Sequence, residues 1–366
     1  MNEPRQSPPP SLADVRQRID ALDTKIQALI AQRAQLAQDV RAAKGPVAST
    51  VDYYRPEREA QVLRGVVERN QGPLSDEEMV RLFREIMSSC LAQQEPLKIA
   101  FLGPEGTFSQ SAAITHFGHA IRSLPLNTIE EVFCEVESGA ADFGVVPVEN
   151  STEGAVSNTL DMFASSPLKI CGEVELRICQ HLLARVGDLR RIERVYSHRQ
   201  SLAQCRGWLH QHLPRAEKIP VASNAEAARR VRHADDAAAI AGDAAAKVYD
   251  LRIVHANIED RPDNTTRFFV IGRGLCSPSG RDKTSLLMSA SDKPGMLYHL
   301  LDPLAKAGVS MTRIESRPSK QGKWDYIFFV EVEGHADEQP LVGALGQLQS
   351  IATLLKVLGS YPHAVC

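Results

Sequence analysis

Closely spaced cysteines are missing from this sequence. Its 366 residues include seven cysteines, which lie far apart and never form a CxxC pair. Disulfide scaffolds and zinc ribbons both need clustered cysteines, so neither class fits. No group of His, Cys, Asp and Glu has metal-site spacing, and "HQH" at residues 210–212 falls in a helical surface stretch. We therefore expect reduced thiols, a cytoplasmic location, and neither a metal nor an organic cofactor.

An excess of one charge sign and long apolar runs are also missing. The formal net charge is −3, which gives no electrostatic reason to expect nucleic acid or a membrane surface as a partner. No apolar run approaches the length of a membrane span. The opening residues "MNEPRQSPPP" are too polar for a signal peptide, and we expect residues 1–10 to be a disordered tail.

What the sequence does contain is enough apolar material for two or three domains, with 43% hydrophobic and 24% charged residues. Three patterns follow one another along the chain. Residues 11–95 are expected to be all-helical, and residues 96–275 to form a two-lobed, doubly wound α/β domain. Residues 276–283 are expected to be a linker, and residues 284–366 a small α+β domain.

Three helices are predicted in the first region. Leu, Ile and Val recur at spacings of three and four from residue 12 to residue 40, which predicts a long helix ending at "KGP", residues 44–46. A second helix is expected over about residues 54–70. A third begins at Ser75, where Glu78 completes a capping box.

Polar side chains interrupt the apolar faces of these helices. Arg33 occupies a position of the first stripe where an apolar residue is expected, and Lys44 lies on the same face three turns later. The second helix adds Arg58 and Glu59, and the third adds Gln94. An unpaired buried charge costs several kcal/mol, so these side chains either reach out to solvent or face an anion. Their shared orientation favours an anion site between the helices.

The segments "VRQRIDALDTKIQALIAQRAQLAQDVRAAKG", "RPEREAQVL" and "LFREIMSSCLAQQ" resemble the all-helical chorismate mutases. The resemblance implies that chorismate, a dianion, rearranges here to prephenate by a pericyclic shift that needs no nucleophile or general base. It implies that Lys44 and Gln94 are catalytic donors to the ether oxygen. The substrate-binding residues that it implies are Arg16, Arg33, Arg58 and Glu59. The sequence departs from the family at Arg55, where Asp is common, and at Cys90, where Ser is common.

The spacing of Arg16 and Arg33 predicts a dimer. Seventeen residues separate them, which is about 25 Å along a straight helix and about 100° around it. One small ligand cannot touch both within a single helix. If both serve one site, they come from two chains, so a homodimer or a higher homo-oligomer is expected.

In the α/β region, polar side chains gather where predicted strands end. Thr107 and Ser109 follow "KIAFLG", Asn150 ends "GVVPVEN", Ser197 ends "RVYS", and Thr266 precedes "RFFVIG". Open α/β sheets bind ligands at strand ends, so these clusters can face one cleft. The turn "GPEGTFS" fits neither the GxGxxG nor the P-loop pattern, which makes a nucleotide site a weak interpretation.

The segments "GPEGTFS", "VPVENSTEG", "SHRQSLAQC", "NIEDRPDNTTRF" and "ESRP" resemble the prephenate dehydratases, in that family's order. The resemblance implies that prephenate loses its ring hydroxyl and ring carboxylate together and becomes phenylpyruvate, with Thr266 as the catalytic donor to the departing hydroxyl. The substrate-binding residues that it implies are Thr107, Ser109, Asn150, Ser197, Gln204 and Arg267. Strand alternation points Arg267 away from Thr266, so a bend at the strand's mouth, or an ion pair with Glu149 or Asp263, stays open.

The last region resembles the ACT domain, a module that binds amino acids where two copies pair. The matching segments are "DKPGMLYHLLDPLAKAG" and "IESRPSK". With the other two resemblances, the chain resembles the bifunctional chorismate mutase/prephenate dehydratases of phenylalanine synthesis, so L-phenylalanine is the implied feedback inhibitor. The allosteric residues implied are Gly295, Met296, Leu297, Glu315, Ser316 and Arg317. Two alternatives remain, namely a two-lobed regulator that binds a small anion and an enzyme with only one active site.

Overall fold

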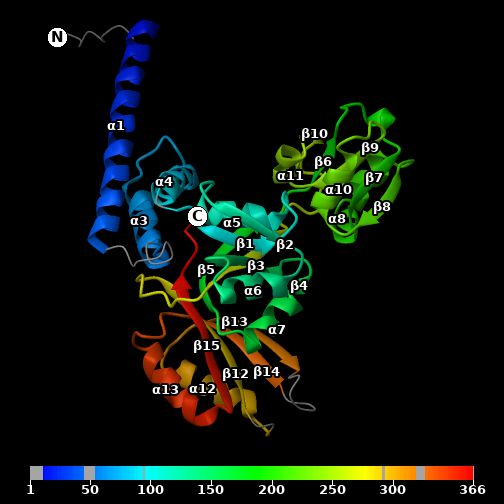
Figure 1. The fold of residues 1–366 in the computed structure, drawn as a ribbon. Coiled ribbons are helices and arrows are strands. Elements are labelled where there is room, and N and C mark those ends of the chain that lie inside the picture. Colours follow the sequence, from blue (N-terminus) through cyan, green and yellow to red (C-terminus); the bar gives the residue numbers. More distant parts are fainter. Residues whose placement is uncertain (1–10, 45–53, 94, 291–292, 319–325, 366) are drawn as a thin grey trace, which may run out of the picture.

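The computed structural model describes residues 11–44, 54–93, 95–290, 293–318 and 326–365. The tail expected at residues 1–10 lies outside this part of the chain. Helices at the N-terminus, a two-lobed α/β region and a C-terminal sheet with two helices follow one another (Figure 1). This arrangement confirms the predicted fold class. Among the described residues, no helix is both long and apolar enough to cross a membrane.

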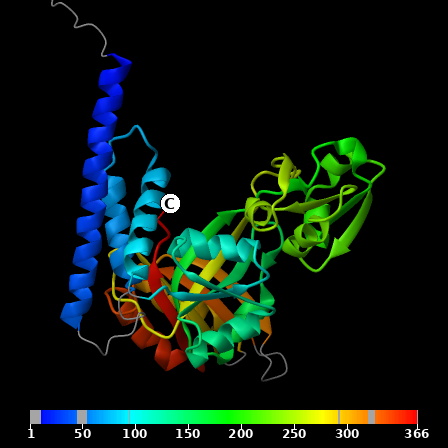
Figure 2. The ribbon, with the colours of Figure 1, turned by 45° about the horizontal axis from the view of Figure 1, so that its top comes forward.

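The N-terminal part consists of α1 (Leu12–Lys44), α3 (Pro56–Arg69) and α4 (Asp76–Ala92). The predicted cap is present, because the Ser75 hydroxyl accepts a hydrogen bond of 3.3 Å from the Glu78 N–H. The C-terminal half of α1 lies beside α3 and α4, and its N-terminal half extends past them (Figures 1 and 2). The apolar stripe of α1 is at least half exposed at Leu12, Ile19, Leu22, Ile26, Leu29, Leu36 and Val40.

The first α/β lobe is built on a mixed sheet of order β2-β1-β3-β11-β5. Its strands are β1 (Lys98–Leu102), β2 (Arg122–Leu126), β3 (Phe143–Asn150), β5 (Lys169–Arg177) and β11 (Thr265–Gly272), and the short β4 (Gly154–Ala155) pairs with β3. Its helices are α5 (Phe108–Phe117), α6 (Ile129–Ser138) and α7 (Ser157–Ser165). Strands β1, β2 and β3 are parallel, whereas β11 runs antiparallel to both of its neighbours.

The second lobe is inserted between β5 and β11, so the chain crosses between the lobes twice. Its sheet has the order β10-β6-β9-β7-β8. The strands are β6 (His181–Ala184), β7 (Arg194–His198), β8 (Glu217–Val221), β9 (Ala237–Ala241) and β10 (Arg252–His255). The helices are η1 (Leu189–Arg191), α8 (Arg199–Gln204), α9 (Arg206–His212), α10 (Asn224–Val231) and α11 (Asp243–Val248). Small alanines fill the core around β9 and α10, where helix and strand lie close together.

The C-terminal sheet has the order β13-β14-β12-β15. Its elements are β12 (Asp282–Ser289), α12 (Met296–Lys306), β13 (Met311–Pro318), β14 (Tyr326–Glu333), α13 (Leu341–Ile351) and β15 (Leu354–Pro362). Leu286 and Val330 pack against the two helices. Leu287 and Phe329, which point to the opposite face, join the core of the first lobe. The sheet is therefore buried between its own helices and the first lobe.

Candidate active sites

A hollow of about 230 Å³ lies between the two lobes, and Thr266 is at its edge. Thr266 at the start of β11 lies opposite Asn150 at the end of β3. The Asn150 side-chain N–H donates to the Thr266 hydroxyl oxygen (2.8 Å) and to the Asn264 side-chain oxygen (2.9 Å). Because Thr266 accepts this bond, its own O–H remains free to donate to a ligand.

Helix starts surround the same hollow. Thr107 caps α5, where its hydroxyl accepts from the Gln110 N–H at 3.4 Å, and Ser109 follows in the first turn. Ser223 caps α10 in the second lobe. Residues at both helix starts line the hollow, and helix N-termini favour negative charge. Among the described side chains that line this hollow, none is a lysine or an arginine.

Two residues of the second lobe occupy different places in the site. Gln204 lines the hollow and accepts a hydrogen bond of 3.2 Å from Asn264 across the lobes. Ser197 is fully buried behind it, with its hydroxyl 2.7 Å from the Ile240 carbonyl and 2.8 Å from the Asn224 side-chain oxygen. Asn224 is the residue that lines the hollow. The structure does not place Ser197 at the hollow, because its hydroxyl is bonded inside the lobe to Ile240 of β9 and Asn224 of α10.

Arg267 does not reach this hollow. Its guanidinium donates to Glu173 at 2.6 and 2.9 Å and to Glu331 at 2.7 and 2.9 Å, on the opposite face of β11. Burial opposes the charge, but hydrogen bonds to Glu331 and the nearby carboxylates raise the pKa of Arg267 above its usual value. The ion pair that had stayed open, with Glu149 or Asp263, is formed with Glu173 and Glu331 instead. Strand alternation places Arg267 against the C-terminal sheet instead.

A second hollow, of about 480 Å³, lies among the N-terminal helices and is lined by Arg33, Arg58 and Glu59. Arg55 and Cys90, the two departures from the mutase pattern, line it as well. Lys44 ends α1, but its side chain and the whole of Gln94 lie outside the described residues. Arg16 is exposed and lies in the first turns of α1. The N-terminal half of α1 projects away from α3 and α4 (Figure 2).

Arg84 of α4 is a lining residue that the sequence patterns did not indicate. Its Nε lies 3.6 Å from a Glu59 carboxylate oxygen, and its guanidinium donates at 3.4 Å to the Val365 carbonyl oxygen near the C-terminus. Val80 and Ser88 are buried on the same side of α4. Val80 lies four residues before Arg84 and Ser88 four residues after it. This helical spacing is the sequence pattern that could have indicated that Arg84 points inward. Leu82, an apolar residue of the same helix, is exposed.

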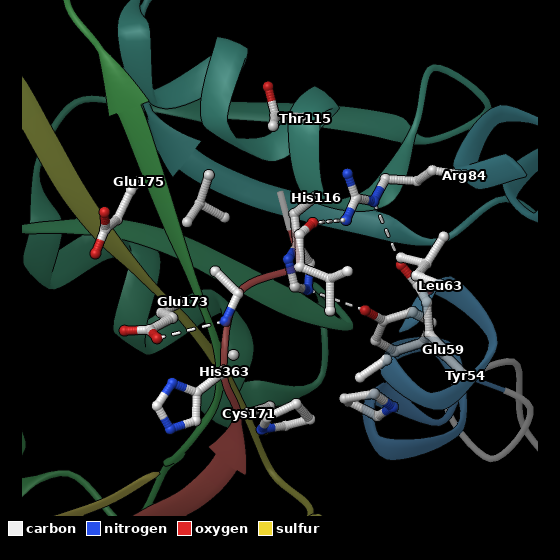
Figure 3. Close-up of a pocket in the computed structure, with 17 residues that line it drawn as sticks. Tyr54, Glu59, Leu63, Arg84, Thr115, His116, Cys171, Glu173, Glu175 and His363 are labelled. Atoms are coloured by element: carbon white, nitrogen blue, oxygen red, sulfur yellow. Dashed lines mark hydrogen bonds and ion pairs between the residues drawn. The ribbon is translucent and has the colours of Figure 1, made fainter. Parts of the chain in front are cut away.

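Glu59 and Arg84 also line a neighbouring hollow between the helices, β5 and the C-terminal tail, shown in Figure 3. There the Tyr54 hydroxyl and His116 Nε2 are 2.9 Å apart, and burial lowers the pKa of His116 to about 3. Burial raises the pKa of Glu59 to about 7, against the opposing effect of Arg84. Burial in this hollow therefore favours the protonated form of the Glu59 carboxyl group.

The residues expected at the effector site lie on two elements. Gly295 begins α12 with a φ of 80°, followed by Met296 and Leu297. Glu315, Ser316 and Arg317 lie on the edge strand β13. Arg317 is engaged with the first lobe, where it donates to the Ser157 carbonyl oxygen at 2.8 Å and lies 3.4 Å from Asp161.

Comparison with known proteins assigns each part of the chain. Family models match it as chorismate mutase type II over residues 15–95, prephenate dehydratase over residues 99–275 and ACT domain over residues 284–349. A bifunctional chorismate mutase/prephenate dehydratase from Pseudomonas aeruginosa is 54% identical over 360 residues, covering 97% of this chain and 98% of the relative. The chain belongs to this bifunctional family. It is accordingly an enzyme with a mutase and a dehydratase domain.

Two solved structures are similar to the dehydratase and ACT domains together. A prephenate dehydratase from Arthrobacter aurescens in complex with L-Phe is 36% identical, with a TM-score of 0.67, and the match covers 73% of this chain and 90% of that one. A protein described as GqqA, a novel type of quorum-quenching acylase, is 32% identical, with a TM-score of 0.68, over 73% of this chain and 98% of that one. One fold therefore carries two described activities.

The raised pKa of Glu59 predicts how pH affects stability. A free Glu has a pKa of 4.5, whereas folded Glu59 has a pKa of about 7. The contribution of Glu59 to the free energy of unfolding is therefore fully present below pH 4.5 and is lost as pH rises through about 7. The folded state then has to bury a charge. We compare the thermal unfolding midpoints of wild type and Glu59→Gln. The wild-type midpoint should decrease relative to that of the variant as the pH is raised from 5 to 8. Glu68→Gln, an exposed change on the same helix, should show no such trend, and equal trends in both variants would contradict the assignment.

Proposed function

We propose that this chain converts chorismate to prephenate in the groove of α1, α3 and α4, and prephenate to phenylpyruvate in the cleft between the lobes. L-phenylalanine binding at the C-terminal domain inhibits the second step, as an amino-acid complex is described for the Arthrobacter relative. The observation that carries the dehydratase assignment is the hydrogen-bonded pair of Thr266 and Asn150 at the cleft. A cytoplasmic location belongs to the same proposal, supported by six free cysteines among the described residues.

The dehydratase step needs a donor at one atom. The bond from the ring to the hydroxyl breaks, the ring carboxylate leaves as CO₂, and the electrons of its carbon–carbon bond complete the aromatic ring. The departing hydroxide takes up a proton and becomes water. Thr266 donates a hydrogen bond to that oxygen as charge develops on it, which lowers the barrier more than it strengthens ground-state binding.

The substrate's carboxylates are held by neutral donors in this proposal. The N-termini of α5 and α10 present backbone N–H groups and partial positive charge to the hollow. The side-chain amide of Gln204 adds a further hydrogen-bond donor. Arg267 is thereby removed from the substrate and assigned to the protein's interior.

The mutase step depends on holding one conformer and stabilising the ether oxygen. Arg33 and Arg58 supply the positive charge that a dianion requires, and Glu59 accepts from the ring hydroxyl. Lys44 and Gln94 are assigned as donors to the ether oxygen when its bond breaks. Arg16 is assigned to a second chain, because it lies seventeen residues from Arg33 on the same helix and cannot reach the ligand that Arg33 binds. The exposed apolar stripe of α1 supports a partner helix there, and hence a homodimer.

Thr266→Ala tests the dehydratase assignment. We expect kcat for prephenate to fall about a hundredfold with little change in KM, since the hydroxyl acts on the departing group. A spectrophotometric assay of phenylpyruvate formation measures both constants. Thr265→Ala is the matched control, because its side chain does not line the hollow. A Thr266 variant that loses binding and keeps kcat would show that the donor is another group.

Lys44→Ala tests the mutase assignment. Removing a donor to the ether oxygen should slow chorismate consumption about a hundredfold, which corresponds to about 3 kcal/mol. Dehydratase activity on supplied prephenate should remain at the wild-type level in the same preparation. Near-normal mutase turnover would exclude Lys44 from the mechanism.

Mixed oligomers test whether Arg16 and Arg33 come from different chains. Arg16→Ala and Arg33→Ala should each lack mutase activity alone. Co-refolding them at equal amounts should restore up to about a quarter of the sites, since some pairs then combine both intact arginines in one site. Sedimentation should show a dimer or larger. Full mutase activity in a monomer would refute the shared site.

A further inference from the structure

The two strands that meet at the dehydratase cleft also face the C-terminal sheet. β3 and β11 pair so that Thr266 lies opposite Asn150 and Arg267 lies opposite Glu149. Opposed residues share a face and successive residues alternate between faces. The first pair therefore lines the cleft, and the second pair points to the C-terminal sheet. A β-bulge directly after Arg267 marks where this pairing changes register.

Six charged side chains form a continuous chain between the two sheets. In order along the chain of contacts they are Lys283, Glu173, Arg267, Glu331, Arg313 and Glu149. Successive nitrogen–oxygen distances are 2.8, 2.6 and 2.7 Å, then 3.9 and 2.9 Å. Three members belong to the first lobe and three to the C-terminal sheet, and positive and negative charges alternate. The C-terminal sheet is thus ion-paired to the direct neighbours of both Thr266 and Asn150.

The central members of this chain are largely withdrawn from water, whereas the Glu149 side chain at its end is 37% exposed. The exposed fractions are 2% for Glu173, 8% for Glu331 and 11% for Arg267. Removing one partner of a buried ion pair leaves an uncompensated charge, which is far more costly than losing a surface pair. The members are therefore constrained to move together, and a displacement of β14 carries β11 with it.

We propose that Arg267 and Glu149 are positioning residues of the dehydratase, through which Glu331 and Arg313 of the C-terminal sheet set the spacing of Thr266 and Asn150. The inference rests on the proposed dehydratase function and adds the route by which the C-terminal domain controls it. The hydrogen bond between Asn150 and Thr266 joins two strands over 2.8 Å, so a relative shift of those strands redirects the Thr266 hydroxyl. An effector that binds one arrangement of the C-terminal sheet more tightly than another shifts the protein toward that arrangement. The shift then changes the turnover rate of the dehydratase.

Glu331→Gln in the full-length protein tests this route, because it keeps the shape and removes the charge. We expect dehydratase kcat to fall about tenfold while KM for prephenate changes less than about twofold. The concentration of L-phenylalanine for half inhibition should rise about tenfold, because the coupling is broken. Arg313→Gln should give the same pattern more weakly, since the Glu149 pair that it breaks is less enclosed. Mutase activity in the same molecules should be unchanged.

The matched control is Asp302→Asn, which removes the charge of an exposed ion pair with Lys306 in the same domain (2.7 Å). It should leave kcat, KM and phenylalanine inhibition at wild-type values. A merely structural role for Glu331 would lower the thermal unfolding midpoint but leave kcat and half inhibition per folded molecule unchanged, and that result overturns the inference. If Glu331→Gln does not fold, Arg313→Gln tests the inference by the same two measurements, the dehydratase kcat and the L-phenylalanine concentration for half inhibition. A wild type without dehydratase activity would instead refute the proposed function itself.

Discussion

The guanidinium of Arg267 joins the catalytic lobe to the C-terminal sheet, and the packing of the two parts depends on it. It lies between Glu173 of the lobe and Glu331 of the sheet, with its charged carbon 5.0 Å from the centre of the Phe269 ring. Phe269, Leu287 and Phe329 form the apolar core around it. An apolar core alone tolerates sliding of one sheet over the other, whereas a bidentate ion pair specifies one alignment. The alignment of the two sheets therefore follows from this polar centre.

Much of the fold could be predicted from local patterns. The cap at Ser75 depends on atoms three residues apart, and the end of α1 on Gly and Pro a few residues away. The position of Thr266 at a strand's mouth could be predicted for the same reason. The partners of Arg267 could not, because Glu173 and Glu331 are 94 and 64 residues away. Glu173 becomes a neighbour only when β5 pairs with β11, and Glu331 only when the C-terminal sheet packs on the first lobe. Alternation correctly indicated that Arg267 points away from Thr266, yet it does not identify what lies on the other side.

The N-terminal helices show a different limit of sequence reasoning. The apolar stripe of α1 predicts a helix with one face that avoids water, and in the single chain that face is exposed. Apolar residues at helical spacing indicate that one face of a helix avoids water. They do not show whether that face is buried by the same chain or by a partner chain. The separation of Arg16 and Arg33 supplies that missing information, because helix geometry forbids one chain from bringing both to one ligand. Arg84 was missed because its partners, Glu59 of α3 and the Val365 carbonyl oxygen, come from distant parts of the chain that no local pattern connects to α4.

The two proposed sites bind the carboxylates of their substrates with different groups, guanidinium groups in the first site and neutral donors in the second. The chemistry of each step accounts for the difference. Chorismate keeps both carboxylates throughout its rearrangement, so guanidinium groups in the helical groove bind substrate and transition state alike while the conformer is held. Prephenate loses one carboxylate as CO₂ during its reaction. An arginine paired with that carboxylate would stabilise the substrate more than the transition state, in which the charge is moving into the ring, and would slow the step. Helix N-termini and amides give weaker, fixed attraction, which suits a charge that disappears. The described residues that line the cleft include no arginine, and the guanidinium of the neighbouring Arg267 serves instead to join the domains.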